Sequence, residues 1–183
     1  LLLESEARTN LVTYSSNFVG AGRTKNGVNL STGASSPYGV STLATNLSGT
    51  ASYIRYTTTL SSTTTYTKSI VAKAGDSDWL YFDVSSYSLT NGMVHFNVST
   101  GEVGTVGADF TNATIENVGD GFYRSAASFT TAADVTGYID YGFSTSDAST
   151  ASATGSTHII AAQLEVGSTP SSYIPTSGST VTR

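Results

Sequence analysis

The sequence predicts an all-β protein, an antiparallel two-sheet sandwich of jelly-roll type. Charged residues make up only 11% of the chain, and the composition is rich in Ser, Thr, Gly and Tyr, which favours strands over helices. Many short segments alternate between apolar and polar residues, and turn-forming residues separate them. Apolar residues do not recur at a helical period for more than two turns. Many short antiparallel strands without cysteine are typical of a two-sheet sandwich.

The alternating segments place the strands along the chain. Short edge strands are expected near residues 1–3 and 10–14, and residues 145–156 are expected to form a mobile surface loop. Turns are expected at residues 91–92, 100–101 and 120–121, where glycine favours tight hairpins. The main strands are expected at residues 28–30, 38–44, 52–57, 63–74, 79–85, 93–98, 113–118, 122–130, 136–144 and 157–166.

Length and charge restrict the function. A chain of 183 residues corresponds to one domain covering residues 1–183. Its net charge of -5 gives no cationic face for nucleic acid. No stretch approaches the roughly 20 apolar residues that would insert into a membrane. Leu1 is not an initiating methionine, so we expect a module excised or processed from a longer protein.

Strand alternation identifies candidate binding residues. Along residues 79–84 the apolar side chains of Leu80, Phe82 and Val84 should enter the core, because successive side chains point to opposite faces of a sheet. The same alternation applies to residues 53–58, 93–98 and 138–143. The outward set is then Trp79, Tyr81, Asp83, His95, Asn97, Tyr138, Asp140, Tyr53 and Arg55.

This outward set combines aromatic rings with charged and amide groups, the mixture that binds sugars through ring stacking and bidentate hydrogen bonds. Alternation does not say whether these strands share one sheet, or whether another layer covers them. Trp79, the single tryptophan, is expected to be exposed as a sugar platform beside Tyr81. A protein interface is the alternative use of such aromatics.

Catalysis has weaker support. A glycosidase needs two carboxylates about 5 to 10 Å apart, one with a raised pKa. Asp83 and Asp140 are expected among open polar residues, and His158 is expected on the core side of its strand. We therefore predict a binding module and not an enzyme.

A family resemblance agrees with this interpretation. Residues 161–176 followed by 177–183 are near-identical to a closing pattern AQLE-G--P-SYIPT-G--VTR, and residues 7–11, 66–75, 96–101 and 119–124 match further motifs in order. The chain thereby resembles β-sandwich modules of bacteriophage tail fibre and tailspike proteins, described as carbohydrate-binding. It departs from them at Gly22 and Arg23, near which a tryptophan is common, and at Phe122, which stands in place of another.

The resemblance implies binding of a host polysaccharide or cell-surface glycan, location in a virion tail or outside the cell, and a homo-oligomer formed through the parent tail protein. A structural module that packs within a tail fibre is the alternative. No cofactor is expected, although Glu4, Glu6 and Glu165 could come together around a structural calcium ion. We also expect residues 163–175 to pair with residues 4–11, so that both ends emerge on one side.

Overall fold

The computed structural model describes residues 6–18, 23–38, 43–89, 92–149 and 154–183, and this part of the chain is all-β with antiparallel pairing. Its strands are β1 (Thr9–Asn10), β2 (Arg23–Ser35), β3 (Leu43–Thr59), β4 (Thr65–Ala74), β5 (Trp79–Ser86), β6 (Met93–Asn97), β7 (Glu102–Val106), β8 (Phe110–Gly119), β9 (Phe122–Thr130), β10 (Thr136–Ser144), β11 (Thr154–Val166) and β12 (Val181–Thr182).

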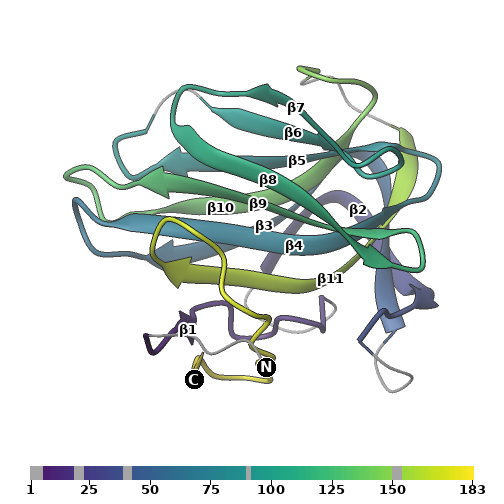
Figure 1. Ribbon diagram of the computed structural model, residues 1–183. Coiled ribbons are helices and arrows are strands. Elements are labelled where there is room, and N and C mark those ends of the chain that lie inside the picture. The colour runs from purple at the N-terminus through teal and green to yellow at the C-terminus, as the bar shows by residue number, and fades with distance from the viewer. Residues whose placement is uncertain (1–5, 19–22, 39–42, 90–91, 150–153) are drawn as a thin grey trace.

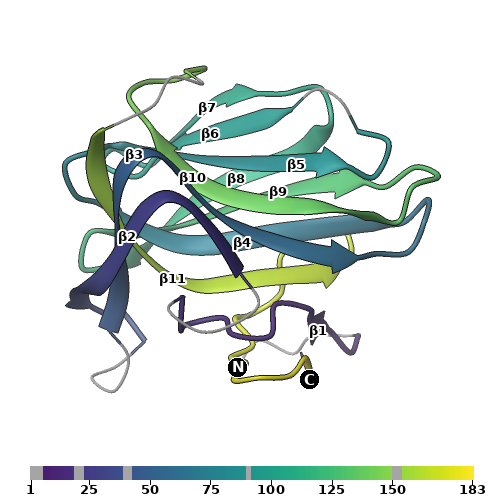
Figure 2. The same ribbon diagram turned by 180° about the vertical axis from the view of Figure 1, so that it is seen from behind.

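Two layers face each other across a common core (Figures 1 and 2). Hydrogen bonds run without a break in the order β7-β6-β5-β10-β3-β11-β4-β9-β8, and β2 also pairs with β3. The fold-over lies where β3 changes partner, because residues 53–59 pair with β10 and residues 45–50 pair with β11. One layer therefore contains β2, β3, β10, β5, β6 and β7, and the other contains β11, β4, β9 and β8. The antiparallel all-β class is confirmed, whereas the jelly-roll topology stays a prediction.

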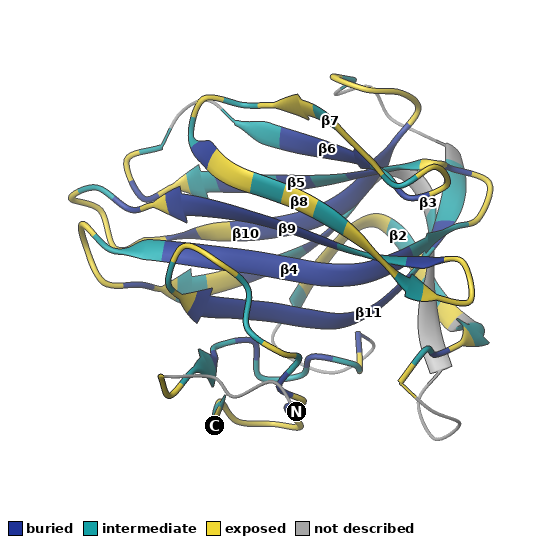
Figure 3. Cartoon of the chain, viewed as in Figure 1, coloured by how far each residue is buried: buried dark blue, intermediate teal, exposed yellow. Residues whose placement is uncertain are grey.

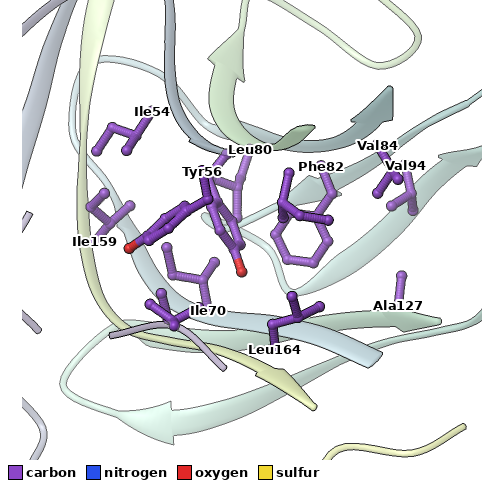
Figure 4. Close-up of a cluster of buried hydrophobic side chains, with 14 of the residues drawn as sticks. Ile54, Tyr56, Ile70, Leu80, Phe82, Val84, Val94, Ala127, Ile159 and Leu164 are labelled. Atoms are coloured by element: carbon purple, nitrogen blue, oxygen red, sulfur yellow. The ribbon is translucent and has the colours of Figure 1, made fainter. Parts of the chain in front are cut away.

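Large apolar side chains from both layers fill the space between them (Figure 4). Ile54 and Phe82 on one side and Ile70 on the other have no exposed surface. Leu80 and Val84 are also buried, as the alternation along β5 predicts. Phe82 and Tyr141 meet edge to face at 5.2 Å between ring centroids, which is a favourable arrangement for aromatic pairs.

The first described residues and the C-terminal residues come together near β11. Thr9 pairs with Thr182 in the β1–β12 ladder, and the Leu11 amide donates to the Leu164 carbonyl at 2.7 Å. Among the described residues from Glu6 onward, the N-terminal region contacts the expected closing segment at Leu164 and, through the Asn10 side chain, at Ile174. The strand that pairs with β1 is β12, which lies beyond the expected range 163–175. Glu4 and the expected strand at residues 1–3 lie outside the described residues.

Several local expectations were wrong. Of the strand expected at residues 38–44, residue 38 is in a turn, residues 39–42 lie outside the described part, and residues 43–44 belong to β3. The strand β7 was not expected. β11 already begins at residue 154, inside the expected loop. A bulge between Ile160 and Gln163, where Ala161 has φ 59°, reverses the alternation along β11. Ile159 therefore enters the main core, and His158 faces away from it.

Exposure differs strongly among the strands. Figure 3 shows β4 and β11 buried along most of their length, whereas β7 and β8 are largely exposed or half-buried. Among the described residues no helix has the length and apolar character needed to cross a membrane.

Candidate functional site

All nine residues selected from the sequence lie on one face, the outer face of the six-stranded layer. Strand register puts Tyr53, Gly142, Tyr81 and His95 in one row across β3, β10, β5 and β6. Neighbouring rows join Trp79 to Asn97, Arg55 to Asp140 and Asp83, and Tyr138 to Ser85. The sequence alone could not show that these strands lie in one sheet. Strand pairing in the structure places β3, β10, β5 and β6 side by side, and Figure 2 shows them from behind the view of Figure 1.

An arginine between two tyrosines forms the centre of this face. The Arg55 guanidinium carbon lies 4.7 Å from the Tyr53 ring centroid and 4.3 Å from that of Tyr138, at distances typical of cation–π contacts. Arg55 also donates from Nε and from an Nη atom to the Asp140 carboxylate at 2.8 and 2.5 Å. These hydrogen bonds are the main reason that the pKa of Arg55 is raised above its ordinary value. The contacts hold both rings and the guanidinium in place, and Tyr138 stays 37% exposed.

A buried lysine approaches the same strands from the core. Lys68 of β4 has no exposed surface, and its ammonium lies between the rings of Phe82 and Tyr141 at 4.6 and 4.3 Å from their centroids. Its Nζ donates to the backbone carbonyls of Asp83 and Asp140 at 3.1 and 2.7 Å. Burial lowers the pKa of Lys68 to about 7, and the negative charges of Asp140 and Asp83 oppose that shift.

Asp83 and Asp140 lie directly opposite each other on β5 and β10, but their surroundings differ. Asp140 is only 2% exposed, and both of its carboxylate oxygens accept hydrogen bonds from Arg55. Asp83 is half-buried and accepts a hydrogen bond from the Ser85 hydroxyl at 3.3 Å. Burial raises the pKa of Asp83 above its ordinary value, with the nearby Lys68 ammonium acting in the opposite direction. The expectation that both carboxylates stand among open polar residues was therefore wrong.

The loop that follows β10 covers one end of this face. His95 points away from the core as the alternation predicts, yet it is only 2% exposed. Its Nε2 lies 3.2 Å from the Ser149 carbonyl oxygen, and its ring packs 6.1 Å from that of Tyr81. Asp147 ties the loop to β7, because its carboxylate accepts the Thr105 amide at 2.7 Å and the Thr105 hydroxyl at 3.1 Å. These hydrogen bonds lower the pKa of Asp147.

Trp79 and Asn97 lie at the end of the face where this loop begins, because Ser144, the last residue of β10, pairs with Trp79. Trp79 is half-buried and not fully exposed, because its ring lies against Gly104 of β7. A methyl group at Gly104 would come within 2.6 Å of Trp79 Cζ3, so glycine makes room for the indole. The Asn97 side-chain oxygen accepts the amides of Ser99 and Thr100 at 2.9 and 3.0 Å. Asn97 thereby stabilises the β6–β7 turn, in addition to any contact with a ligand.

A pocket of about 600 Å³ opens beside Asp83 and His95. This volume lies within the range of about 300–1,000 Å³ that is usual for small-ligand pockets. Other residues that line it include Ser85 on β5, Met93 on β6, Thr105 on β7, and Ala148 in the loop after β10.

Sequence reasoning missed three components of this site. Lys68 could have been found, because Tyr66, Ile70 and Ala72 alternate with it on the core side of β4. The part of the pocket wall formed by Thr105 could not have been found from the sequence, because β7 is largely exposed and its residues do not alternate between apolar and polar. Asp147 gave no signal either, since a single aspartate in a Ser/Thr-rich loop is usually solvated.

A metal centre has no support in the described part of the chain, where no three His, Asp or Glu side chains gather. Glu165 is buried, and one of its oxygens accepts the Gln163 amide at 2.7 Å and the Ser171 amide at 2.9 Å. The calcium hypothesis involving Glu4 cannot be placed, because that residue lies outside the described ranges.

Comparison with solved structures gives a fold-level match. The chain is similar to the enzymatically active domain of tailspike protein 4 from bacteriophage CBA120, with a TM-score of 0.53 and 13% sequence identity. The match covers 86% of this chain and 21% of that chain. No model of a protein family and no curated protein matches the sequence. The similarity therefore concerns the fold, and the match spans only a small part of the tailspike chain.

Proposed function

We propose that this chain is a non-catalytic polysaccharide-binding module that recognises a surface glycan through the outer face of the six-stranded layer. The observation that carries the proposal is the gathering of Tyr53, Arg55, Tyr138, Tyr81 and Trp79 on one side of neighbouring strands. Rings held in place stack on the C–H faces of sugars, and the polar groups between them bind hydroxyls. Ring positions that are fixed before binding also reduce the entropy cost of association.

The same geometry argues against glycoside hydrolysis at this face. Hydrolysis needs two carboxyl groups that both reach the glycosidic bond. Asp140 is buried and both of its oxygens are bonded to Arg55, so Asp83 stands alone as an accessible carboxyl group of the pair. We expect no increase in reducing ends when the protein is incubated with any polysaccharide that it binds.

The setting in a phage tail is part of the proposal. The closing motif and the fold similarity to a tailspike domain support it, and the adjacent chain ends suit insertion in a longer fibre. In that setting the glycan would belong to the host surface, and the parent tail protein would set the oligomeric state.

Affinity electrophoresis in gels containing a broad panel of polysaccharides tests the binding function. We expect at least one polymer to slow the protein, and Tyr138→Ala to weaken that retardation about tenfold, equivalent to about 1.4 kcal/mol. Tyr38→Ala is the matched control, because Tyr38 is also exposed but lies against Tyr173 near the chain ends. If no polymer slows the protein and it self-associates in the ultracentrifuge instead, the assembly alternative is correct.

A further inference from the structure

A buried hydrogen-bonding group without a partner among the described residues lies on a side chain of the pocket beside Asp83 and His95. His95 is 2% exposed and lines the pocket, and its Nδ1 has no hydrogen-bond partner in the described part of the chain. Because the Ser149 carbonyl can only accept, the contact at 3.2 Å assigns the ring proton to Nε2. Nδ1 is then an acceptor. A buried polar atom without a partner costs free energy, and a ligand that donates to it would recover that cost.

The second polar group of the pocket, the Asp83 side chain, is also a hydrogen-bond acceptor. Asp83 presents a carboxylate, and its neighbour Ser85 already donates to it at 3.3 Å. Two acceptors favour a ligand rich in hydroxyl donors. A carboxylate or sulfate group on a ligand can only accept, so it would face both acceptors without forming a hydrogen bond.

The charged groups around the pocket also disfavour an anionic ligand. Asp83 lies in the wall and Asp147 lies beside it on the loop that holds Thr105. The cation on this face, Arg55, is paired with Asp140. The Lys68 ammonium lies on the core side of β5, where it donates to the Asp83 backbone carbonyl and not to its carboxylate. An anionic ligand would therefore enter against the negative charge of Asp83 and Asp147.

From these observations we propose that the pocket binds a sugar unit that presents hydroxyl donors to Asp83 and His95, and that it excludes sugars carrying carboxylate or sulfate groups. This inference rests on the proposed glycan-binding function and specifies its ligand class. The rest of the outer face would then stack on neighbouring units of the same chain.

Matched pairs of polymers test this selectivity. Affinity gels would contain dextran, mannan and galactomannan, each unmodified and carboxymethylated. We expect a neutral polymer to slow the protein, and its carboxymethylated form to bind at least tenfold more weakly. Stronger or equal retardation by the carboxymethylated forms, or by polygalacturonate or hyaluronan, would overturn the inference and leave the binding function standing. Retardation by no polymer at all would overturn both.

Two variants locate the effect in the pocket. Asp83→Asn removes the wall charge and should reduce the preference for the unmodified polymer at least threefold. Asp120→Asn removes the same charge at a distant turn, where φ 53° suits asparagine equally well, and should change nothing. Ala108→Trp places a large side chain at an exposed position of the pocket wall and should weaken neutral-polymer binding at least tenfold. Unchanged binding by a folded Ala108→Trp protein would show that the sugar does not enter the pocket.

Discussion

The outward residues of β5 and those of β11 differ in what lies over them. On β5, Trp79, Tyr81 and Asp83 remain half-buried on an open face. On β11, Gln163 and Glu165 also point away from the main core, yet both are fully buried. The segment that follows β11 covers them: the Ile174 amide donates to Gln163 at 2.8 Å, and the Ser171 amide donates to Glu165 at 2.9 Å. The comparison shows that alternation predicts the direction of a side chain but not what covers it.

The two surfaces consequently have different roles. Most polar groups under the closing segment are bonded to one another or to its backbone, although Glu165 Oε2 has no partner among the described residues, and the segment covers them so that a ligand does not reach them. On the β5 side His95 Nδ1 likewise has no partner among the described residues, but here a pocket opens beside His95. Substitutions on the two surfaces should therefore separate stability from binding.

The largest effect is expected at Asn10, which joins the two chain ends. Asn10 is fully buried, donates to the Ala162 and Ile174 carbonyls, and accepts from the Val12 and Leu164 amides. Asn10→Ala leaves all four groups without this partner and should lower the free energy of unfolding by at least about 4 kcal/mol, since each unsatisfied buried group costs about 1–3 kcal/mol.

Denaturant unfolding followed by circular dichroism measures this loss. Asn117→Ala is the control, because Asn117 accepts one amide in an exposed turn. It should cost less than about 1 kcal/mol. A loss of similar size in both variants would show that the closing segment does not seal this surface.

The next effect concerns the ion pair on the open face. Arg55→Leu leaves the Asp140 carboxylate, 2% exposed, without its cation. Loss of a fully buried partner costs about 3–5 kcal/mol, and the partial exposure of Arg55 reduces this to about 2 to 3 kcal/mol. Adding Asp140→Val to the same protein should recover most of the loss, because no charge then remains buried. If the double variant is no more stable than Arg55→Leu, the ion pair does not account for the cost.

Strand alternation made the outward direction of the nine face residues predictable. In each strand the apolar side chains mark the core side, so the side chains between them must point to the outer face. Their gathering on one sheet was not predictable, since it depends on long-range strand order. The burial of His95 depends on a loop more than 50 residues away along the chain, held by Asp147. The predicted direction of the His158 side chain was wrong, because the bulge at Ala161 that reverses the alternation has no clear signal in the sequence. Lys68 was missed because it is a charged residue among the apolar residues on the core side of β4, and a charged residue is not expected at a core position.

A pH dependence is expected from Lys68. Its pKa is lowered to about 7 by burial, from an ordinary value of 10.5. Protonation therefore favours the unfolded chain, so the contribution of Lys68 to the free energy of unfolding is greatest above pH 10.5 and falls as the pH decreases toward 7. Between pH 9 and pH 7 the free energy of unfolding should fall by about 2 kcal/mol, with a slope of up to about 1.4 kcal/mol per pH unit.

Unfolding curves of the wild-type protein and of Lys68→Met across this range measure the effect. Methionine has a similar length and no charge, so the slope should disappear in the variant. Burial keeps the pKa of Tyr141 well above 10, so Tyr141 does not contribute within this window. An equal slope in both proteins would assign the dependence to other groups.

The smallest effect is expected at Gly104, where the open face meets β7. A methyl group there would lie 2.6 Å from Trp79 Cζ3 and 2.4 Å from an Asp147 carboxylate oxygen, so Gly104→Ala must displace one of them. The stability cost should be about 1 kcal/mol, since both neighbours are partly exposed and can shift.

Trp79 is the single indole of the chain, and its fluorescence reports its surroundings directly. In the wild-type protein, emission should lie between the buried and exposed limits, and acrylamide should quench it in part. In Gly104→Ala, emission should move to the red and quenching should increase, whereas Val106→Ala on the same strand should leave both unchanged. An unshifted spectrum in Gly104→Ala would mean that Trp79 does not rest on β7, and that the indole is held on the open face by other contacts.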